Sequence, residues 1–155
     1  VIPSPNLPNM TSIYLYPSLC YFEATNVSLG RGTDQPFQQF GHPNMKDYDY
    51  SFTPESREGA KNPPQLGNKC FGRDLSGMSD DEIIAKQLDL SYLIEAYRSV
   101  NEGDKFFTSF FEKLIGVDWV RTMIEEGKSA EEISQRWKPD VEKFKQQSRK
   151  YLLYK

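Results

Sequence analysis

Residues 79–84, Ser-Asp-Asp-Glu-Ile-Ile, divide the chain into two halves of different character. Ser79 and Glu82 have the three-residue spacing of a capping box, in which each side chain satisfies a backbone N–H at the start of a helix. Beyond this box, apolar residues recur at helical spacing, at Ile83, Ile84, Leu88, Leu93, Ile94 and Tyr97. We therefore predict one helix from Ser79 to about Val100 and mainly helical structure after it.

Glycine residues end two further predicted helices. Gly116 follows a helix over Phe106–Ile115, and Gly127 follows a helix over Trp119–Glu126. Glycine suits these positions because it adopts the left-handed backbone that ends a helix without strain. Asp118 is in position to cap the second of these helices.

A second capping box, Ser129 with Glu132, begins the C-terminal helical region. Pro139 fits the first turn of a helix, where its missing N–H costs no hydrogen bond, so we predict that the last helix begins there. The apolar residues of this last helix are Val141, Phe144, Tyr151 and Leu152.

The half before Ser79 holds most of the prolines and glycines, and short strand-like runs separate its turn signals. The predicted strands are Ile13–Tyr16, Leu19–Glu23, Pro36–Phe40, Tyr50–Thr53 and Lys69–Leu75. Strands followed by helices indicate an α+β fold. We predict a small antiparallel sheet in the N-terminal half, covered by helices from the C-terminal half.

The start of the chain predicts its domain organisation. Its Pro-rich opening predicts an extended interdomain linker or strap over residues 1–12, which leaves residues 13–155 as a single α+β domain. The chain begins without Met and without the pattern of a signal peptide, so we expect it to be part of a longer protein. No apolar run approaches the length of a membrane span, so none is expected.

Composition excludes several classes of protein. The chain has 19 basic and 22 acidic residues and a net charge of −3, which argues against nucleic acid as a partner. Two cysteines, Cys20 and Cys70, are either a single bridge or two buried thiols. Together with one histidine they are too few for a zinc site, so no metal is expected. Aromatic residues make up 14% of the chain, which suits both a core and a sugar site.

The chemistry-bearing groups concentrate in residues 22–34, Phe-Glu-Ala-Thr-Asn-Val-Ser-Leu-Gly-Arg-Gly-Thr-Asp. Glu23 ends an apolar run, and a carboxylate there faces the loops, where sites usually lie. Arg31 stands between two glycines, and its planar fork suits either an ion pair with Glu23 or a ligand carboxylate. The purely structural alternative is an ordinary salt bridge in a loop whose other polar side chains satisfy turn backbone.

This stretch, extended to residue 37 and continued by Phe40-Gly41-His42-Pro43, resembles the signature of the NamZ-like exo-β-N-acetylmuramidases. That family was first described as a domain of unknown function. Ala24 and His42 depart from its usual Gly and small residue, which leaves fine specificity open. The resemblance covers nearly the whole chain and includes Tyr16-Pro17-Ser18-Leu19-Cys20, Phe52-Thr53-Pro54 and Gly67-Asn68-Lys69-Cys70-Phe71-Gly72.

The resemblance implies a bacterial glycoside hydrolase, of which this chain is the C-terminal domain. Such enzymes pair it with an N-terminal Rossmann-like domain and are thought to release N-acetylmuramic acid from peptidoglycan fragments in the cleft between the two. The implied partners are muropeptides and the missing N-terminal domain, in the cell envelope, periplasmic or secreted, during cell-wall recycling. No cofactor is implied, because two carboxyl groups suffice for glycosidic cleavage. The domain alone is expected to be inactive.

On this resemblance Glu23 is the expected catalytic carboxylate, with its role as acid, base or hydroxyl acceptor left open. Arg31 would receive the lactyl carboxylate that distinguishes muramic acid from N-acetylglucosamine. Asp34 is a weaker second carboxylate. The expected substrate-binding residues are Asn26, Ser28, Arg31, Thr33, Asp34 and His42.

Two alternatives remain open. The domain is either a non-catalytic module that binds muramyl sugars or cell wall, or a docking or oligomerisation domain that uses its helical half.

Overall fold

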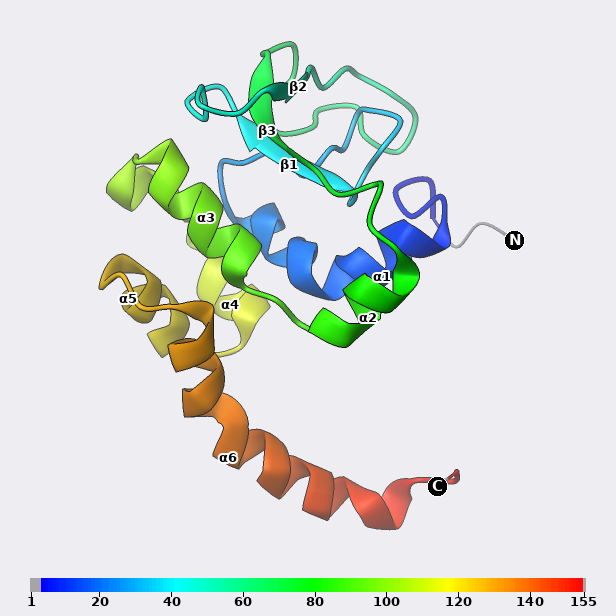
Figure 1. Cartoon of the computed structure of the whole chain (residues 1–155), viewed down its shortest axis with the longest axis vertical. Coiled ribbons are helices and arrows are strands. Elements are labelled where there is room, and N and C mark those ends of the chain that lie inside the picture. The colour runs from blue at the N-terminus through cyan, green and yellow to red at the C-terminus, as the bar shows by residue number, and fades with distance from the viewer. Residues whose placement is uncertain (1–3, 155) are drawn as a thin grey trace.

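A computed structural model of the chain describes residues 4–154 (Figure 1). The strands are β1 (Gln39–His42), β2 (Tyr50–Phe52) and β3 (Cys70–Asp74). The α-helices are α1 (Met10–Leu19), α2 (Asp80–Lys86), α3 (Ser91–Val100), α4 (Phe111–Ile115), α5 (Trp119–Glu125) and α6 (Ala130–Ser148). The 3-10 helices are η1 (Cys20–Ala24), η2 (Gly103–Lys105) and η3 (Arg149–Tyr151). The α+β prediction is confirmed.

The three strands form an antiparallel sheet in the order β1-β3-β2, which confirms the predicted antiparallel arrangement. Gly41 of β1 lies opposite Gly72 of β3. A Cβ added at Gly72 would stand 2.0 Å from the carbonyl oxygen of Phe40, so this close approach of two strands requires glycine.

The sheet rests on helices from both halves of the chain. Phe40 of β1 stacks on Phe22 of η1 with ring centroids 5.0 Å apart, and lies 6.0 Å from the ring of Tyr92 in α3. All three side chains are buried in one hydrophobic core. The sheet is therefore covered not only by C-terminal helices, as predicted, but also by η1, which continues α1.

Two predicted strands are wrong: Ile13–Tyr16 lies within α1, and Leu19–Glu23 runs through the end of α1 into η1. Asn9 begins α1 through a capping box, in which its side chain accepts from the N–H of Ser12 at 2.9 Å. This local signal outweighs the strand propensity of the aromatic and branched residues that follow. The linker predicted over residues 1–12 overlaps the start of α1, and residues 1–3 lie outside the described part of the chain.

The helix predicted from Ser79 to Val100 is two helices, α2 and α3. The Ser79–Glu82 capping box begins α2 as predicted, but Gln87 takes a left-handed φ of 54° and ends it. Ser18 of α1 stabilises the break between α2 and α3, because its hydroxyl donates to the carbonyl of Gln87 at 3.1 Å and accepts from the N–H of Asp89 at 2.9 Å.

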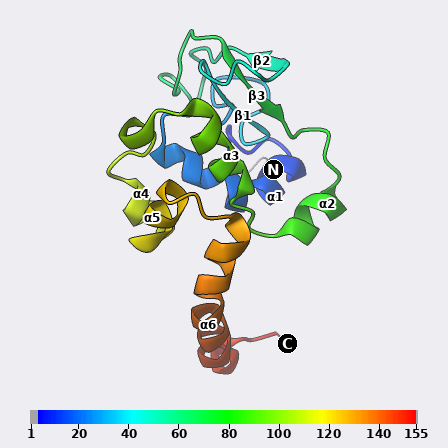
Figure 2. The same cartoon turned by 60° about the vertical axis from the view of Figure 1, so that its left-hand side comes forward.

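The last helical region also differs from its prediction. The Ser129–Glu132 box begins α6 as predicted, and α6 continues through Pro139 without a second start. The proline removes one backbone hydrogen bond, but its φ is compatible with a helix. Asp118 precedes α5 without a capping hydrogen bond from its side chain. α6 extends away from the rest of the molecule (Figure 2).

Cys20 and Cys70 are both free thiols. Burial raises the pKa of Cys20 to about 11 and that of Cys70 to about 12. Within residues 4–154 no helix is both long and apolar enough to cross a membrane.

Candidate functional site

Glu23 and Arg31 form an ion pair at the start of the loop between η1 and β1. The Arg31 guanidinium donates to Oε1 of Glu23, and the two side chains are each about 30% exposed. The guanidinium carbon also lies 5.3 Å from the centre of the Phe37 ring. Nε of Arg31 is buried and makes no hydrogen bond within the described part of the chain. One face of this pair is thus packed and the other faces solvent.

Glycines hold Arg31 in this position. Gly30 and Gly32 have φ values of 82° and 81°, which side-chain-bearing residues rarely adopt. A Cβ on Gly30 would stand 2.5 Å from the carbonyl oxygen of Gln35, and one on Gly32 would stand 2.3 Å from that of Glu55. The turn that presents Arg31 therefore depends on both glycines.

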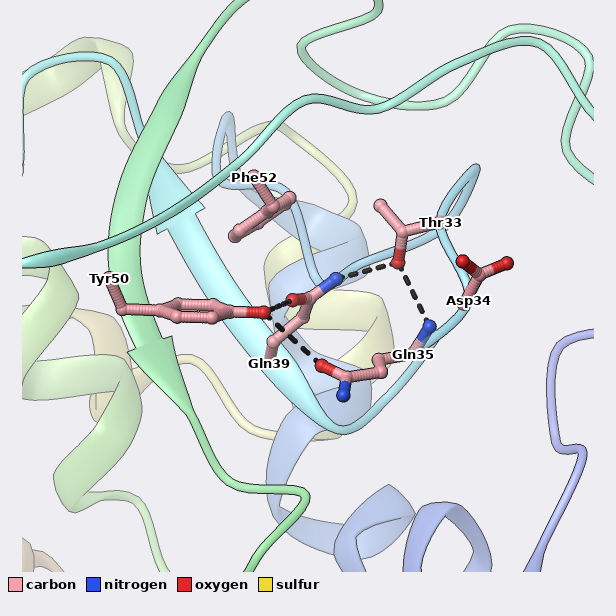
Figure 3. Close-up of a pocket in the computed structure, with 6 residues that line it drawn as sticks. All are labelled: Thr33, Asp34, Gln35, Gln39, Tyr50 and Phe52. Atoms are coloured by element: carbon pink, nitrogen blue, oxygen red, sulfur yellow. Dashed lines mark hydrogen bonds between the residues drawn. The ribbon is translucent and has the colours of Figure 1, made fainter.

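A pocket of about 250 Å³ follows in the same loop and opens against β2 (Figure 3). The Thr33 hydroxyl accepts from Nε2 of Gln39 at 2.6 Å and from the N–H of Gln35 at 3.1 Å. The Tyr50 hydroxyl donates to the side-chain oxygens of Gln35 and Gln39. Burial, followed by the charge of Asp74, raises the Tyr50 pKa, so this hydroxyl keeps its proton. The pocket is lined by Thr33, Asp34, Gln35, Gln39, Tyr50 and Phe52.

A second polar cluster links the loop to the helical half. Oε2 of Glu102 accepts from Nδ2 of Asn26 at 2.6 Å, and its Oε1 accepts from Nδ2 of Asn44 at 2.7 Å. The N–H of Asn44 donates to Nδ1 of His42 at 3.2 Å. Burial lowers the pKa of His42, and the nearby charge of Glu102 acts in the opposite direction. His42 is therefore a buried imidazole whose Nδ1 is an acceptor.

The remaining predicted residues have structural contacts. Ser28 is fully buried, exchanges two backbone hydrogen bonds with Gly41, and its hydroxyl accepts from the N–H of Gly30 at 3.3 Å. The carboxylate of Asp34 is largely exposed and pairs with the guanidinium of Arg57.

The structure divides the predicted residues among separate places. Glu23 meets Arg31, Thr33 and Asp34 line the pocket, and Asn26 and His42 belong to the cluster around Glu102. Sequence reasoning missed the other polar residues of these places: Gln35, Gln39, Asn44, Tyr50 and Glu102. Gln35 lies within the signature stretch and Gln39 just after it, so both could have been found there. Glu102 had no local signal, because it lies 76 residues from its partner Asn26.

Within residues 4–154 no group of three or more His, Cys, Asp or Glu side chains could hold a metal ion. The polar groups of the ion pair and the pocket are the Glu23–Arg31 pair, the Asp34 carboxylate, the amides of Gln35 and Gln39, the Thr33 hydroxyl and the Tyr50 phenol. Such groups bind polar, uncharged or anionic ligands through hydrogen bonds.

The fold and the site define an α+β domain whose candidate site residues lie in and around the loop between η1 and β1. Residues 14–154 match the family model described as exo-beta-N-acetylmuramidase NamZ, C-terminal. The chain belongs to this family, which confirms the resemblance seen in its sequence.

Relatives of known name or structure agree with this membership. The chain is 33% identical over 166 residues to peptidoglycan beta-N-acetylmuramidase NamZ of Bacillus subtilis strain 168, and the match covers 99% of the chain and 40% of that protein. A crystal structure of a DUF1343 family protein from Bacteroides fragilis NCTC 9343 is 63% identical, with a TM-score of 0.97 over 99% of this chain and 44% of the other. A second such protein from the same organism shares the fold, at 20% identity and a TM-score of 0.66 over 100% of this chain and 45% of its own. The chain thus spans less than half the length of these relatives.

Proposed function

We propose that the chain is the C-terminal domain of an exo-β-N-acetylmuramidase and forms one wall of an active-site cleft. The other wall would be an N-terminal domain, and residues 13–155 would form the C-terminal domain after a short linker. The substrate would be muropeptides or other peptidoglycan fragments, met in the cell envelope. Family membership supports this proposal, and the Glu23–Arg31 pair is the observation that carries it.

Glycoside hydrolysis needs two carboxyl groups on either side of the scissile bond. In this proposal Glu23 supplies one and the N-terminal domain supplies the other. Because Arg31 occupies Oε1 of Glu23, we assign Oε2 to the substrate. A carboxylate held by a guanidinium through one oxygen keeps its other oxygen for accepting a hydrogen bond from the substrate.

Arg31 is the proposed recognition group for the lactyl carboxylate of N-acetylmuramic acid. Its guanidinium has five N–H donors in a planar fork, which suits a second carboxylate beside Glu23. The Arg31 side chain is about 30% exposed, which leaves part of the guanidinium open to a ligand. N-acetylglucosamine lacks the lactyl group, so this contact would provide discrimination between the two sugars.

The pocket supports a second candidate function, a module that binds muramyl sugars without taking part in catalysis. Its amide groups match sugar hydroxyls and N-acetyl groups, and the rings of Tyr50 and Phe52 stand 6.1 Å apart beside them. In this case both catalytic carboxyl groups would lie on the N-terminal domain.

The two candidates are distinguished in the full-length parent protein with a chromogenic β-N-acetylmuramide and the matching β-N-acetylglucosaminide. Under the proposal, Glu23→Gln lowers kcat on the muramide by about 10²–10⁴-fold and leaves substrate binding largely intact. Glu55→Gln, at an exposed carboxylate paired with Arg57, is the matched control and keeps normal turnover. Near-normal kcat with a raised KM in Glu23→Gln would favour the binding module, and a parent that cleaves neither sugar would refute the muramidase proposal.

A further inference from the structure

An apolar stripe runs along α6 and leaves the core as the helix leaves the body of the protein. Ile133 is fully buried, Trp137 is half-buried, Val141 is 42% exposed and Phe144 is 67% exposed. The spacing of four, four and three residues places all of them on one helix face. The part of this face that packs against the core ends near Trp137, but apolar residues continue along the helix beyond it. We call Trp137, Val141 and Phe144 the α6 stripe.

The end of the stripe nearest the body of the protein borders an apolar pocket of about 390 Å³. Leu88, from the link between α2 and α3, and Val117, from the link between α4 and α5, form part of its walls opposite Trp137 and Val141. Leu88 and Val117 are themselves exposed. Beyond the helix, residues 151–154, Tyr-Leu-Leu-Tyr, are all exposed as well. The stripe, the pocket and this segment are a run of apolar surface of the kind that marks an interface.

A helix in this position lacks support from the described residues. The second half of α6 projects from the body (Figures 1 and 2). A few helical turns without packing partners are marginal in water, because most helix stability in proteins comes from burying an apolar face. The opposite face carries charged and polar residues, including Glu142 and Gln146, so only the stripe side is suited to contact.

The projecting direction of α6 is shared by an experimental structure. The Bacteroides fragilis relative superposes closely over 99% of this chain, and α6 is 19 of the 155 residues, so a helix turned elsewhere would not give that agreement. That relative has a chain more than twice as long, since the match covers 44% of it. The helix therefore keeps its direction where further protein of the same chain is present.

We propose that the α6 stripe is a docking surface for the N-terminal domain of the same protein. The inference rests on the proposed function only in so far as this chain is the C-terminal part of a longer protein. Docking of the stripe would fix the position of the two cleft walls relative to each other, through a contact away from the Glu23–Arg31 pair. Val141 and Phe144 would become buried in the assembled protein, and Gln146 would stay in water.

Thiol labelling of the full-length parent tests the docking. Phe144→Cys reports on the stripe, and Gln146→Cys, on the opposite face of the same helix, is the matched control. Peptide mass spectrometry reads both positions separately from Cys20 and Cys70. We expect a maleimide to label position 144 about tenfold more slowly than position 146 in native buffer, and equally fast in urea. Val141→Cys repeats the measurement one turn nearer the body.

Three results would overturn the proposal. Equal labelling of positions 144 and 146 in the native parent would mean that the stripe is open to water. Protection that disappears on dilution, together with a dimer mass by light scattering, would assign the surface to a second copy. Protection that arises only on addition of lipid vesicles would assign it to a membrane surface. The labelling rates are independent of hydrolysis, so a parent that cleaves no muramide would still give a clear answer about docking.

Discussion

The guanidinium of Arg31 donates a hydrogen bond to Oε1 of Glu23, eight residues earlier in the chain. This contact joins the 3-10 helix η1 to the glycine-flanked turn and brings a carboxylate and a guanidinium to one place. The stacking of Arg31 near Phe37 adds a second constraint on its position.

We predict that Arg31→Lys impairs substrate recognition more than folding. Lysine keeps the charge but loses the planar fork, so a second carboxylate beside Glu23 would be held less well. Because the ion pair is partly exposed, the free energy of unfolding should fall by only about 1 kcal/mol or less. Steady-state kinetics of the full-length parent should show a raised KM for the muramide and no change for the control variant Glu55→Gln. An unchanged KM in Arg31→Lys would remove Arg31 from the substrate site.

Gly72→Ala should strongly destabilise the domain. Its Cβ would stand 2.0 Å from the carbonyl oxygen of Phe40 in the neighbouring strand, and backbone cannot move aside as a side chain can. We expect the free energy of unfolding from urea titrations to fall by about 2–3 kcal/mol. Gly77→Ala is the matched control, because nothing lies within 4 Å of the added Cβ, and its effect should stay within about 0.5 kcal/mol. Equal stability of the two variants would contradict the close approach of β1 and β3.

Glu102→Ala should loosen the loop through Asn26 and Asn44. It removes the acceptor of two amide groups at once, at 2.6 and 2.7 Å. The expected loss in unfolding free energy is about 1–3 kcal/mol, and Glu102→Gln should lose less, because its side-chain oxygen still accepts one hydrogen bond. Asp104→Ala, two residues further on at an exposed position, should be nearly neutral. A neutral Glu102→Ala would show that the cluster contributes nothing to stability.

His42 should make stability depend on pH. Burial lowers its pKa in the folded protein, so the unfolded chain binds a proton first as the pH falls below about 6.5. The stabilising contribution is therefore present above the unfolded pKa and is lost as the pH falls toward the folded pKa. Between about pH 7.5 and 5.5, urea titrations should show a larger loss of stability in the wild type than in His42→Asn, whose side-chain oxygen can replace Nδ1 as the acceptor. Parallel pH profiles for the two proteins would contradict this assignment.

The sequence anticipated the parts of the fold and site that depend on neighbouring residues. The capping boxes at Ser79 and Ser129 begin α2 and α6 where expected, because each is a contact between residues three positions apart. An ion pair with Glu23 was one of the two roles predicted for Arg31 for a similar reason, since the residues are only eight positions apart with Gly30 between them. The signature stretch also pointed to the correct family.

Other features required contacts between distant parts of the chain. The predicted helix over residues 79–100 breaks where Ser18, from the other half of the chain, forms hydrogen bonds to Gln87 and Asp89 within the break. The pocket forms because β2 brings Tyr50 beside Gln35 and Gln39. No local sequence pattern indicates such contacts between residues far apart in the chain.

The sequence by itself therefore determined the α+β class, the starts of α2, α5 and α6 and the polar loop around Glu23, because short-range hydrogen bonds and apolar periodicity encode them. Only the tertiary structure decided that the helix predicted over residues 79–100 breaks at Gln87 and that Asn26 meets Glu102. It also decided that the apolar face of α6 extends beyond the core. The physical reason is that burial and long-range hydrogen bonding select among local conformations of similar energy, and the chain must fold before those contacts exist.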